Sequence, residues 1–396
     1  RIITETGFGK SFPAIEMKLG STRGTNALLE RKGARAALLI TKGFKDLLSI
    51  GTQQRSDLFA LEIIKESPLY TTVIEVDERI ESDGHILKSL SAEEAENIAK
   101  EIKKSNCDSV AIAFLNSYKN PSHEKFIKDY LIKSQAFVTA SYEISGQIKI
   151  LPRAETAVAN AYLAPIINRY ISNIEQGISR AKIKIMTSAG GLVDALSFYP
   201  KDSLLSGPAG GVVGAATAAS LSGINQIITF DMGGTSTDVS LYDKQYAYRY
   251  ESKVGEVKIL SPSLAIETIA AGGGSICDFD GYKLTVGPHS AGASPGPACY
   301  GSGGPLTITD VNLLLGRADS TYFSIPLYKE KSETALIQLI KKIKTSTGKT
   351  PSRESALESL IQIANEKMAE AIKKVSVQQG HDPAEYTLLS FGGAGG

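Results

Sequence analysis

Apolar and polar positions in the first half of the chain alternate between short hydrophobic runs and amphipathic stretches. Runs of small and β-branched apolar residues are typical of buried strands, and they occupy 36–40, 109–114 and 136–140. The stretches between them predict helices over 43–50, from the capping box Ser91–Glu94 to about 104, and from 120 to about 133. Strands that alternate with helices in this way predict an α/β domain.

The pattern changes after residue 150. A long helical stretch covers about 153–180, and Pro165 is expected to kink or split it because proline lacks an amide hydrogen. A strand over 182–187 leads to the segment 204–220, which is rich in glycine and alanine and is the expected hinge between two domains. The expected domains are 1–200 and 201–396.

The second half contains more glycine loops and one long amphipathic helix. The helix is expected over about 354–378, with its apolar residues on one face. A strand over 386–391 then runs into the glycines Gly392 and Gly393. Another glycine cluster, at 270–275, is an expected loop.

The segment 230–239 is the most informative part of the sequence about function. The apolar runs 226–229 and 239–242 predict two strands joined by a tight turn at Gly233 and Gly234. Glycines let the backbone turn its N–H groups toward a ligand, and a row of such groups binds phosphate. Hydroxyl groups that add to this turn come from Thr235, Ser236 and Thr237.

Two carboxylates, Asp231 and Asp238, bracket the turn. A carboxylate beside a phosphate indicates a bridging Mg²⁺. Asp231 is therefore the candidate metal ligand, and both aspartates are candidate catalytic residues. The alternative is an ordinary β-hairpin whose glycines serve only the turn.

Composition narrows the class of protein. The 396 residues carry 43 basic and 42 acidic side chains, a net charge of +1, which argues against a general affinity for nucleic acid or anionic membrane. No apolar run approaches the roughly 20 residues of a membrane span. The three cysteines form no Cys-x-x-Cys pair and favour a reducing cytoplasm.

A second cluster of polar residues, Cys277, Asp278, His289 and Cys299, contains zinc-ligand types. Its spacing matches no familiar zinc module, so a metal site here is the less favoured interpretation. The other histidines, His85, His123 and His381, are expected at the surface. The role of Glu155, which follows Arg153 in the long helix, is open.

Many segments in order resemble the hydantoinase A/5-oxoprolinase family, a branch of the actin-like ATPase and sugar-kinase (ribonuclease H-like) fold. The segment 50–59 resembles the oxoprolinase side in particular. The other matching segments are 24–34, 41–46, 204–214, the Asp231 hairpin, 271–276, 286–288, 290–293, 295–301, 309–312 and 391–395.

The resemblance implies two domains with a nucleotide cleft between them. It assigns Asp231, Gly233, Gly234, Thr235 and Thr237 to the second phosphate loop. It also places the adenosine near Gly392 and Gly393, and implies that Gly272, Gly273 and Gly274 line the same cleft. The implied cofactors are ATP and Mg²⁺, with K⁺ as a further cation.

The activity implied by the resemblance is ATP-dependent opening of a cyclic amide, a hydantoin or 5-oxoproline, after phosphorylation of its carbonyl oxygen. The implied partners are a second, hydantoinase B-type subunit and further copies in an oligomer. The alternatives are a ketone carboxylase subunit, a small-molecule kinase of the same fold and a non-catalytic nucleotide-binding subunit.

Two departures from the family pattern stand out. No Asp-x-Gly-Gly-Thr hairpin, the first phosphate loop of the family, precedes Gly24. No histidine follows Gly392 and Gly393. The 396 residues are therefore expected to be a partial view of a longer protein, which alone would neither hydrolyse ATP efficiently nor open a lactam.

Overall fold

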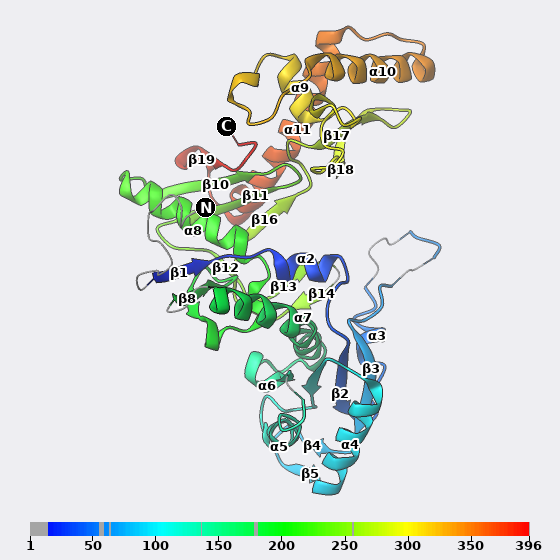
Figure 1. Ribbon diagram of the computed structural model, residues 1–396, viewed down its shortest axis with the longest axis vertical. Helices are drawn as coiled ribbons and strands as arrows, with labels where there is room; N and C mark the ends of the chain where they lie inside the picture. The colour runs from blue at the N-terminus through cyan, green and yellow to red at the C-terminus, as the bar shows by residue number, and fades with distance from the viewer. Residues whose placement is uncertain are drawn as a thin grey trace. The chain divides into compact units, whose positions relative to one another are not determined.

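The computed structural model describes residues 15–54, 59–62, 65–135, 137–177, 181–255 and 257–395. The chain divides into two compact units. The first holds the described residues up to Gly210 together with Tyr248–Leu264, and the second holds Gly211–Ala247 with the described residues from Ala265 onward. Figure 1 follows the chain through both units.

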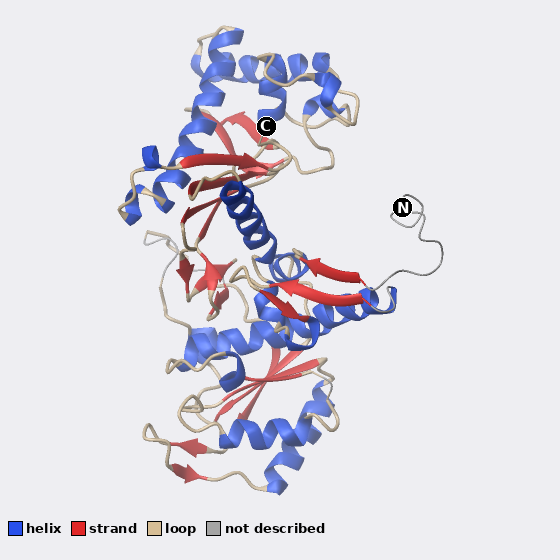
Figure 2. Ribbon diagram, turned by 90° about the vertical axis from the view of Figure 1, so that its left-hand side faces the viewer, coloured by secondary structure: helices blue, strands red, loops and turns tan. Residues whose placement is uncertain are grey.

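A parallel four-stranded sheet with the order β3-β2-β6-β7 forms the centre of the first unit. Its strands are β2 (Ala36–Thr41), β3 (Tyr70–Val76), β6 (Ser109–Ala113) and β7 (Val138–Ala140). The helices around it are α4 (Ala92–Ser105), α5 (Ser122–Leu131), α6 (Ser141–Ile144) and α7 (Ile150–Gly177). In Figure 2 this sheet lies between α7 on one side and α4 and α5 on the other.

Alternation along β2 explains how both faces of this sheet are covered. Leu38 and Ile40 pack into the core that contains α7, whereas Ala37 and Leu39 pack into the core that contains α4 and α5. Successive side chains of a strand point to opposite faces, so a strand buried on both sides reads as a continuous apolar run.

The remaining elements of the first unit are short. A sheet with the order β1-β8-β9 joins β1 (Ile15–Leu19), β8 (Ala181–Met186) and β9 (Leu192–Asp194). Two-stranded pairs are β4 (Arg79–Ile80) with β5 (Ile86–Lys88), β12 (Tyr248–Arg249) with β15 (Ser263–Leu264), and β13 (Ser252–Val254) with β14 (Val257–Ile259). The short helices are α2 (Arg23–Leu29), α3 (Leu47–Ile50), η1 (Ala195–Ser197) and η2 (Pro200–Ser203).

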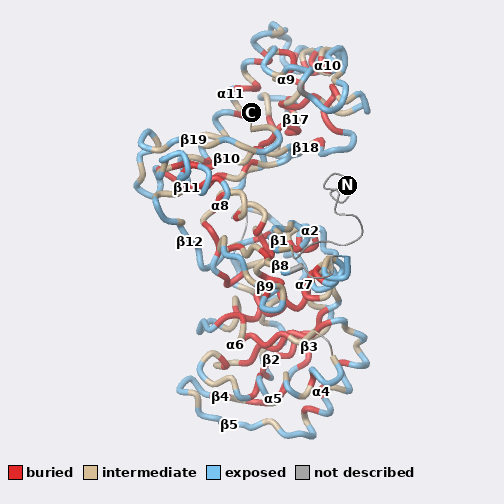
Figure 3. Tube along the Cα trace, turned by 60° about the vertical axis from the view of Figure 1, so that its left-hand side comes forward, coloured by how far each residue is buried: buried red, intermediate tan, exposed pale blue. Residues whose placement is uncertain are grey.

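The second unit is built on a sheet with the order β16-β11-β10-β19. Its strands are β10 (Gln226–Met232), β11 (Thr237–Asp243), β16 (Ile266–Ile269) and β19 (Thr387–Phe391). Residues of α11 (Arg353–Val375) pack on one face, and the alanines of α8 (Ser206–Leu221) pack with Ile227 in a separate cluster. Figure 3 shows buried positions gathered in the strands and in the helix segments that cover them.

A third cluster in this unit packs the other end of α11 against a hairpin and two helices. These elements are β17 (Ser275–Phe279), β18 (Leu284–Ser290), α9 (Ile308–Leu314) and α10 (Lys329–Thr347). The single turns are η3 (Ala298–Tyr300), η4 (Ser320–Tyr322), η5 (Val377–Gln379) and η6 (Pro383–Glu385).

Several sequence predictions are confirmed, and one helix is wrong in its bounds. The first helix is shorter than 43–50, because only α3 (Leu47–Ile50) is helical there. Pro165 does not split α7, which continues from Ile150 to Gly177. Its buried residues on both sides of the proline offset the lost backbone hydrogen bond.

The segment Tyr248–Leu264 breaks the sequence order of the two units. It follows the Asp231 hairpin in sequence, yet it belongs to the first unit, where Val254 and Ile259 join the core around α7. Each unit is therefore made of two separate stretches of the chain, and no single cut in the sequence divides them. Domains 1–200 and 201–396, as parts of a nucleotide clamp, stay a prediction. Part of the oxoprolinase-like segment 50–59, Arg55–Leu58, lies outside the described residues.

No helix within the described ranges is long and apolar enough to cross a membrane.

Candidate functional site

The predicted hairpin is present, and it sets two carboxylates side by side. Strands β10 and β11 pair antiparallel in a register that places Asp231 opposite Asp238 and Met232 opposite Thr237. Thr268 on β16 donates a hydrogen bond of 2.5 Å to Asp238 Oδ1. Both aspartates are therefore fixed on one stretch of sheet, where they precede and follow the turn.

The turn itself leaves three consecutive backbone amides without a partner among the described residues. The Gly233 N–H donates to the Ser236 carbonyl at 2.9 Å and closes the turn. Within the described part of the chain, no hydrogen bond uses the N–H groups of Gly234, Thr235 or Ser236 as donors. Gly234 and Thr235 are exposed. Consecutive free amides of this kind form an anion-binding concavity.

The glycine loop before β17 lies directly against this turn. Gly273 N–H donates to the Gly233 carbonyl at 3.1 Å, and Gly274 N–H donates to the Gly234 carbonyl at 2.6 Å. A β-carbon at Gly272 would lie 2.6 Å from the Gly233 carbonyl oxygen. These glycines are buried, and their amides bond within the protein, Gly272 N–H to Ser275 Oγ at 2.8 Å. The loop thus holds the carbonyl side of the turn, and the amide side stays open.

Two threonines tie these loops together. The buried Thr237 hydroxyl donates to the Ala271 carbonyl at 2.6 Å. The backbone N–H and the hydroxyl of Thr309, in the first turn of α9, both donate to the Gly273 carbonyl at 2.8 Å. Thr235 is exposed, and its hydroxyl accepts a hydrogen bond of 3.5 Å from the Ser290 hydroxyl.

The first turn of α9 is itself held by a buried carboxylate, Asp310. Its oxygens accept hydrogen bonds from the backbone of Ala298, Cys299 and Thr307 and from the hydroxyls of Thr307 and Ser332, at 2.7–3.1 Å. Asp310 therefore connects η3, the start of α9 and the start of α10.

The glycines that end β19 complete the cluster. Strand β19 runs parallel to β10 with Phe391 beside Asp231. The Ala394 N–H donates to the Met232 carbonyl at 2.9 Å. Gly392 and Gly393 are exposed, and Gly392 has φ +93°, a conformation that favours glycine. The structure thus brings Asp231, Asp238, the turn and both glycine loops together in the second unit.

Burial disfavours the charged form of both aspartates. It raises the pKa of Asp231 above its ordinary value. It also raises the pKa of Asp238, where the hydrogen bond from Thr268 opposes the shift and the neighbouring Asp231 adds to it. A cation between these carboxylates and a phosphate would relieve this cost.

The residues fit Mg²⁺ held together with phosphates better than a metal held by protein alone. Mg²⁺ is usually bound through one or two carboxylates, several waters and substrate phosphates. Among the described residues, no three His, Cys, Asp or Glu side chains are grouped to hold a metal ion. Asp231 and Asp238 beside an open row of amides satisfy the first description.

The alternative metal cluster does not form. Cys277 is buried in β17, and burial raises the pKa of its thiol. Asp278 pairs with Lys342 at 2.6 Å, and His289 is exposed. Cys299 is buried, and its burial raises its pKa to about 12. Within the described residues these side chains are not grouped so that they could hold a metal ion.

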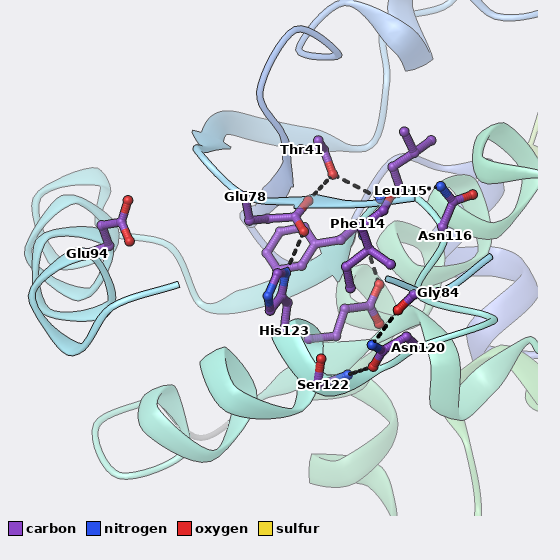
Figure 4. A network of polar contacts seen from close by, with 12 residues as sticks. Thr41, Glu78, Gly84, Glu94, Phe114, Leu115, Asn116, Asn120, Ser122 and His123 are labelled. Atoms are coloured by element: carbon purple, nitrogen blue, oxygen red, sulfur yellow. Dashed lines mark hydrogen bonds and ion pairs between the residues drawn. The ribbon is translucent and has the colours of Figure 1, made fainter. Parts of the chain in front are cut away.

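A second polar network lies at the carboxyl ends of the parallel strands of the first unit (Figure 4). The Thr41 hydroxyl donates to Glu78, whose other oxygen lies 2.7 Å from His123 Nδ1, and the Leu115 N–H donates to Thr41 at 2.8 Å. The prediction that His123 is exposed is wrong, because the start of α5 buries it against Glu78. These side chains fill the end of the sheet where α/β proteins often bind ligands.

Sequence reasoning missed two residues that shape the site. Thr268 positions Asp238, and Gly211 in α8 packs so closely that an added β-carbon would lie 3.5 Å from Asp231 Oδ2. Neither carries a local signal, because each meets the aspartates only through the tertiary fold.

A mixed α/β chain with this hairpin and these glycine loops falls in a defined family. The hydantoinase/oxoprolinase family model matches residues 153–396, and the model of the hydantoinase/oxoprolinase N-terminal region matches residues 12–134. The chain belongs to the hydantoinase/oxoprolinase family.

Two curated relatives illustrate the family. The chain is 40% identical to 5-oxoprolinase from Saccharomyces cerevisiae, over 96% of this chain and 33% of the relative. It is 34% identical to caprolactamase subunit alpha from Pseudomonas jessenii, over 95% of this chain and 56% of the relative. The chain therefore spans about a third of the first relative and just over half of the second.

Solved structures give the same fold. The crystal structure of the ATP-dependent caprolactamase from Pseudomonas jessenii superposes with a TM-score of 0.81 at 32% identity, covering 94% of this chain and 56% of that chain. A nucleotide-free acetone carboxylase superposes with a TM-score of 0.76 at 24% identity, covering 99% and 59%. The second likeness concerns the fold alone.

Proposed function

We propose that this chain is the phosphorylating part of an ATP-dependent enzyme that opens a cyclic amide, and that its fold is of the actin-like ATPase type. The observation that carries the proposal is the row of free amides at Gly234, Thr235 and Ser236 beside Asp231. Family membership and relatives named 5-oxoprolinase and caprolactamase support the reaction.

The chemistry explains why such a reaction needs a phosphate site. An unstrained amide resists water because its nitrogen donates electrons into the carbonyl group. When the amide oxygen attacks the γ-phosphorus of ATP, the bond to the bridging oxygen breaks and ADP leaves. The amide nitrogen gives up its proton as the O-phosphorylated imidate forms, and water then adds at its carbon. The ring C–N bond breaks with the nitrogen leaving as the amine, and a second water hydrolyses the resulting acyl phosphate to the carboxylic acid and phosphate.

The residues of the hairpin take separate parts in this proposal. The amides of Gly234, Thr235 and Ser236 donate to phosphate oxygens and hold the transferred group in line, which is most of the catalysis in phosphoryl transfer. The Thr235 hydroxyl adds a donor on the same side. Asp231 and Asp238 would hold Mg²⁺, which, when bound, neutralises charge on the phosphate oxygens.

The glycine loops act as supports in the same proposal. Gly272, Gly273 and Gly274 keep the turn in shape through their own amides, and Thr237 links turn and loop. Gly392 and Gly393 present an exposed surface without side chains beside Asp231, which suits the approach of a nucleotide. A second subunit or fused half would carry the ring-opening step, in line with the name of the alpha subunit of caprolactamase.

The test is a substrate panel with the full-length protein and any co-purifying partner. Release of ADP is measured with 5-oxoproline, hydantoin, caprolactam and, for the ketone carboxylase alternative, acetone with bicarbonate. We expect one cyclic amide to stimulate ADP release and to yield the ring-opened acid by mass spectrometry. Stimulation by acetone alone, or by no compound, would reject the proposal.

Matched variants locate that activity. Asp231→Asn should abolish stimulated ADP release. Asp243→Asn, at the other end of β11, keeps an acceptor for the Tyr386 hydroxyl 3.2 Å away and should leave the release unchanged. Equal effects of the two substitutions would remove Asp231 from the site.

A further inference from the structure

A small cavity lies in the first unit, beside the start of α7. Its volume is about 90 Å³, and Leu48, Leu69, Val158 and Val257 form much of its wall, with Glu155 as an acidic member. At roughly 10–15 Å³ for each water-sized group, this space accommodates about six to nine such groups. That number matches the non-hydrogen atoms of a small ring compound rather than of a nucleotide.

Among the described residues, no hydrogen-bond partner explains why one oxygen of the Glu155 carboxyl group is buried. Within the described part of the chain, its Oε2 is buried without a hydrogen-bond partner. The neighbouring Thr156 hydroxyl is already used, because it accepts the Leu260 N–H at 2.8 Å. A buried polar atom without a partner is uncommon in native structures and calls for an explanation.

The charges around the cavity do not neutralise Glu155. Arg31, also in the cavity wall, is bonded to Glu66 and to the Ser67 carbonyl. Lys258 on β14 favours the ionised carboxylate and Glu251 opposes it, but burial is the largest effect. It raises the pKa of Glu155 to about 7, so the carboxyl group is largely protonated in mildly acidic solution.

We propose that this cavity binds the cyclic amide substrate and that the protonated Glu155 carboxyl group pairs with its amide edge. The inference rests on the proposed function, which it extends to a substrate site. In rings of five to seven atoms the amide is held cis, so its N–H and C=O lie on the same edge. One oxygen of a carboxylic acid accepts that N–H while the other donates its O–H to the carbonyl.

This pairing selects cyclic amides. An open-chain secondary amide is trans, with its N–H and C=O on opposite edges, and the cis form costs about 2.5–4 kcal/mol. A single carboxyl group therefore cannot bond both groups of an open-chain amide. The apolar wall would cover the ring methylenes, which are the part of the substrate without polar atoms.

The test is a binding measurement on the full-length protein without ATP. The probe is 2-pyrrolidone, titrated at pH 6 and pH 8 by ligand-observed NMR, with N-methyl-2-pyrrolidone and N-methylacetamide as controls. We expect 2-pyrrolidone to bind about tenfold more weakly at pH 8, because most of the Glu155 carboxyl groups have then lost the proton. The two controls should bind weakly at either pH.

Variants of Glu155 separate pairing from a general effect of charge. Glu155→Gln retains one acceptor and gains permanent N–H donors, so it should bind 2-pyrrolidone equally at both pH values. Glu155→Leu should lose binding, and Glu251→Gln, which removes a charge that raises the pKa of Glu155, should shift the loss of binding to lower pH. Should Glu155→Leu fail to fold, the comparison of wild type with Glu155→Gln decides alone.

Three results would overturn the inference: pH-independent binding to wild type, equal binding of N-methyl-2-pyrrolidone, or unchanged binding to a folded Glu155→Leu variant. Lactam-stimulated ADP release that survives in Glu155→Leu would reject this site while the proposed function stands. Binding as predicted, without any lactam-stimulated ADP release, would support the site and reject the proposed function.

Discussion

Gly392 and Asp231 are packed so closely that position 392 has no room for a side chain. A β-carbon there would collide with Asp231 Oδ1 and lie 2.6 Å from the Met232 carbonyl oxygen. The parallel pairing of β19 with β10 sets this distance, since it places Phe391 beside Asp231. The conformation of the loop after β19 and the position of the carboxylate are therefore linked.

This link predicts the effect of Gly392→Ala. The substitution should displace Asp231, lower Mg²⁺-dependent ADP release by at least tenfold and destabilise the protein by about 1–3 kcal/mol. The matched control is Gly380→Ala, at φ +85° with no atom within 4 Å of the added carbon. The control carries backbone strain without the collision, so equal losses in both variants, by activity and thermal unfolding, would contradict the link.

Removing either hairpin carboxylate should raise stability at pH 7 and abolish activity. Burial raises the pKa of Asp231 and Asp238, so the native state favours their neutral forms and loses stability as pH rises through those pKa values. Asp231→Asn and Asp238→Asn should therefore unfold at a higher temperature than wild type at pH 7, yet lose turnover. This gain in unfolding temperature should shrink as pH falls toward 3.8, the ordinary pKa. A lower unfolding temperature at pH 7, with activity kept, would contradict both assignments.

Asp310 should matter for stability far more than an exposed aspartate. Asp310→Ala leaves the buried N–H groups of Cys299 and Thr307 without an acceptor among the described residues, whereas Ala298 keeps the Pro305 carbonyl, and the substitution should destabilise the protein by about 3–5 kcal/mol. Asp319→Ala removes an exposed cap at Thr321 and should cost about 1 kcal/mol. Chemical denaturation measures the free energy of unfolding of both variants. Similar losses in the two would show that Asp310 does not hold these segments together.

Glu155→Gln should change how stability depends on pH. Because burial raises the pKa of Glu155 from 4.5 to about 7, its contribution is complete below pH 4.5 and is lost as pH rises through about 7. The variant lacks this loss, so its unfolding temperature relative to wild type should increase between pH 4.5 and 8 and then level off. Parallel curves for the two proteins would contradict the buried, protonated state.

Local patterns were sufficient to predict much of the fold. The capping box at Ser91 is present with both hydrogen bonds, because the Ser91 hydroxyl accepts the Glu94 N–H and the Glu94 carboxylate accepts the Ser91 N–H. The hairpin around Asp231 is also confirmed as strand, turn and strand. Both signals depend on residues a few positions apart, where the sequence alone fixes the geometry.

Contacts between distant segments could not be predicted in the same way. The residues that support the hairpin, Thr268 and Thr309, lie more than 25 positions away along the chain, and their spacing gives no sign of contact. That the glycines at 272–274 line a cleft stays a prediction, but no sequence pattern indicated that the amides of Gly273 and Gly274 donate to the turn. His123 was misjudged because its burial depends on Glu78, which comes from another element.

The most direct test of the account is a crystal structure of the full-length protein with Mg²⁺ and a non-hydrolysable ATP analogue. The account predicts phosphate oxygens within hydrogen-bonding distance of the Gly234, Thr235 and Ser236 amides, with Mg²⁺ beside Asp231. A nucleotide bound elsewhere, with these three amides still facing solvent, would contradict it.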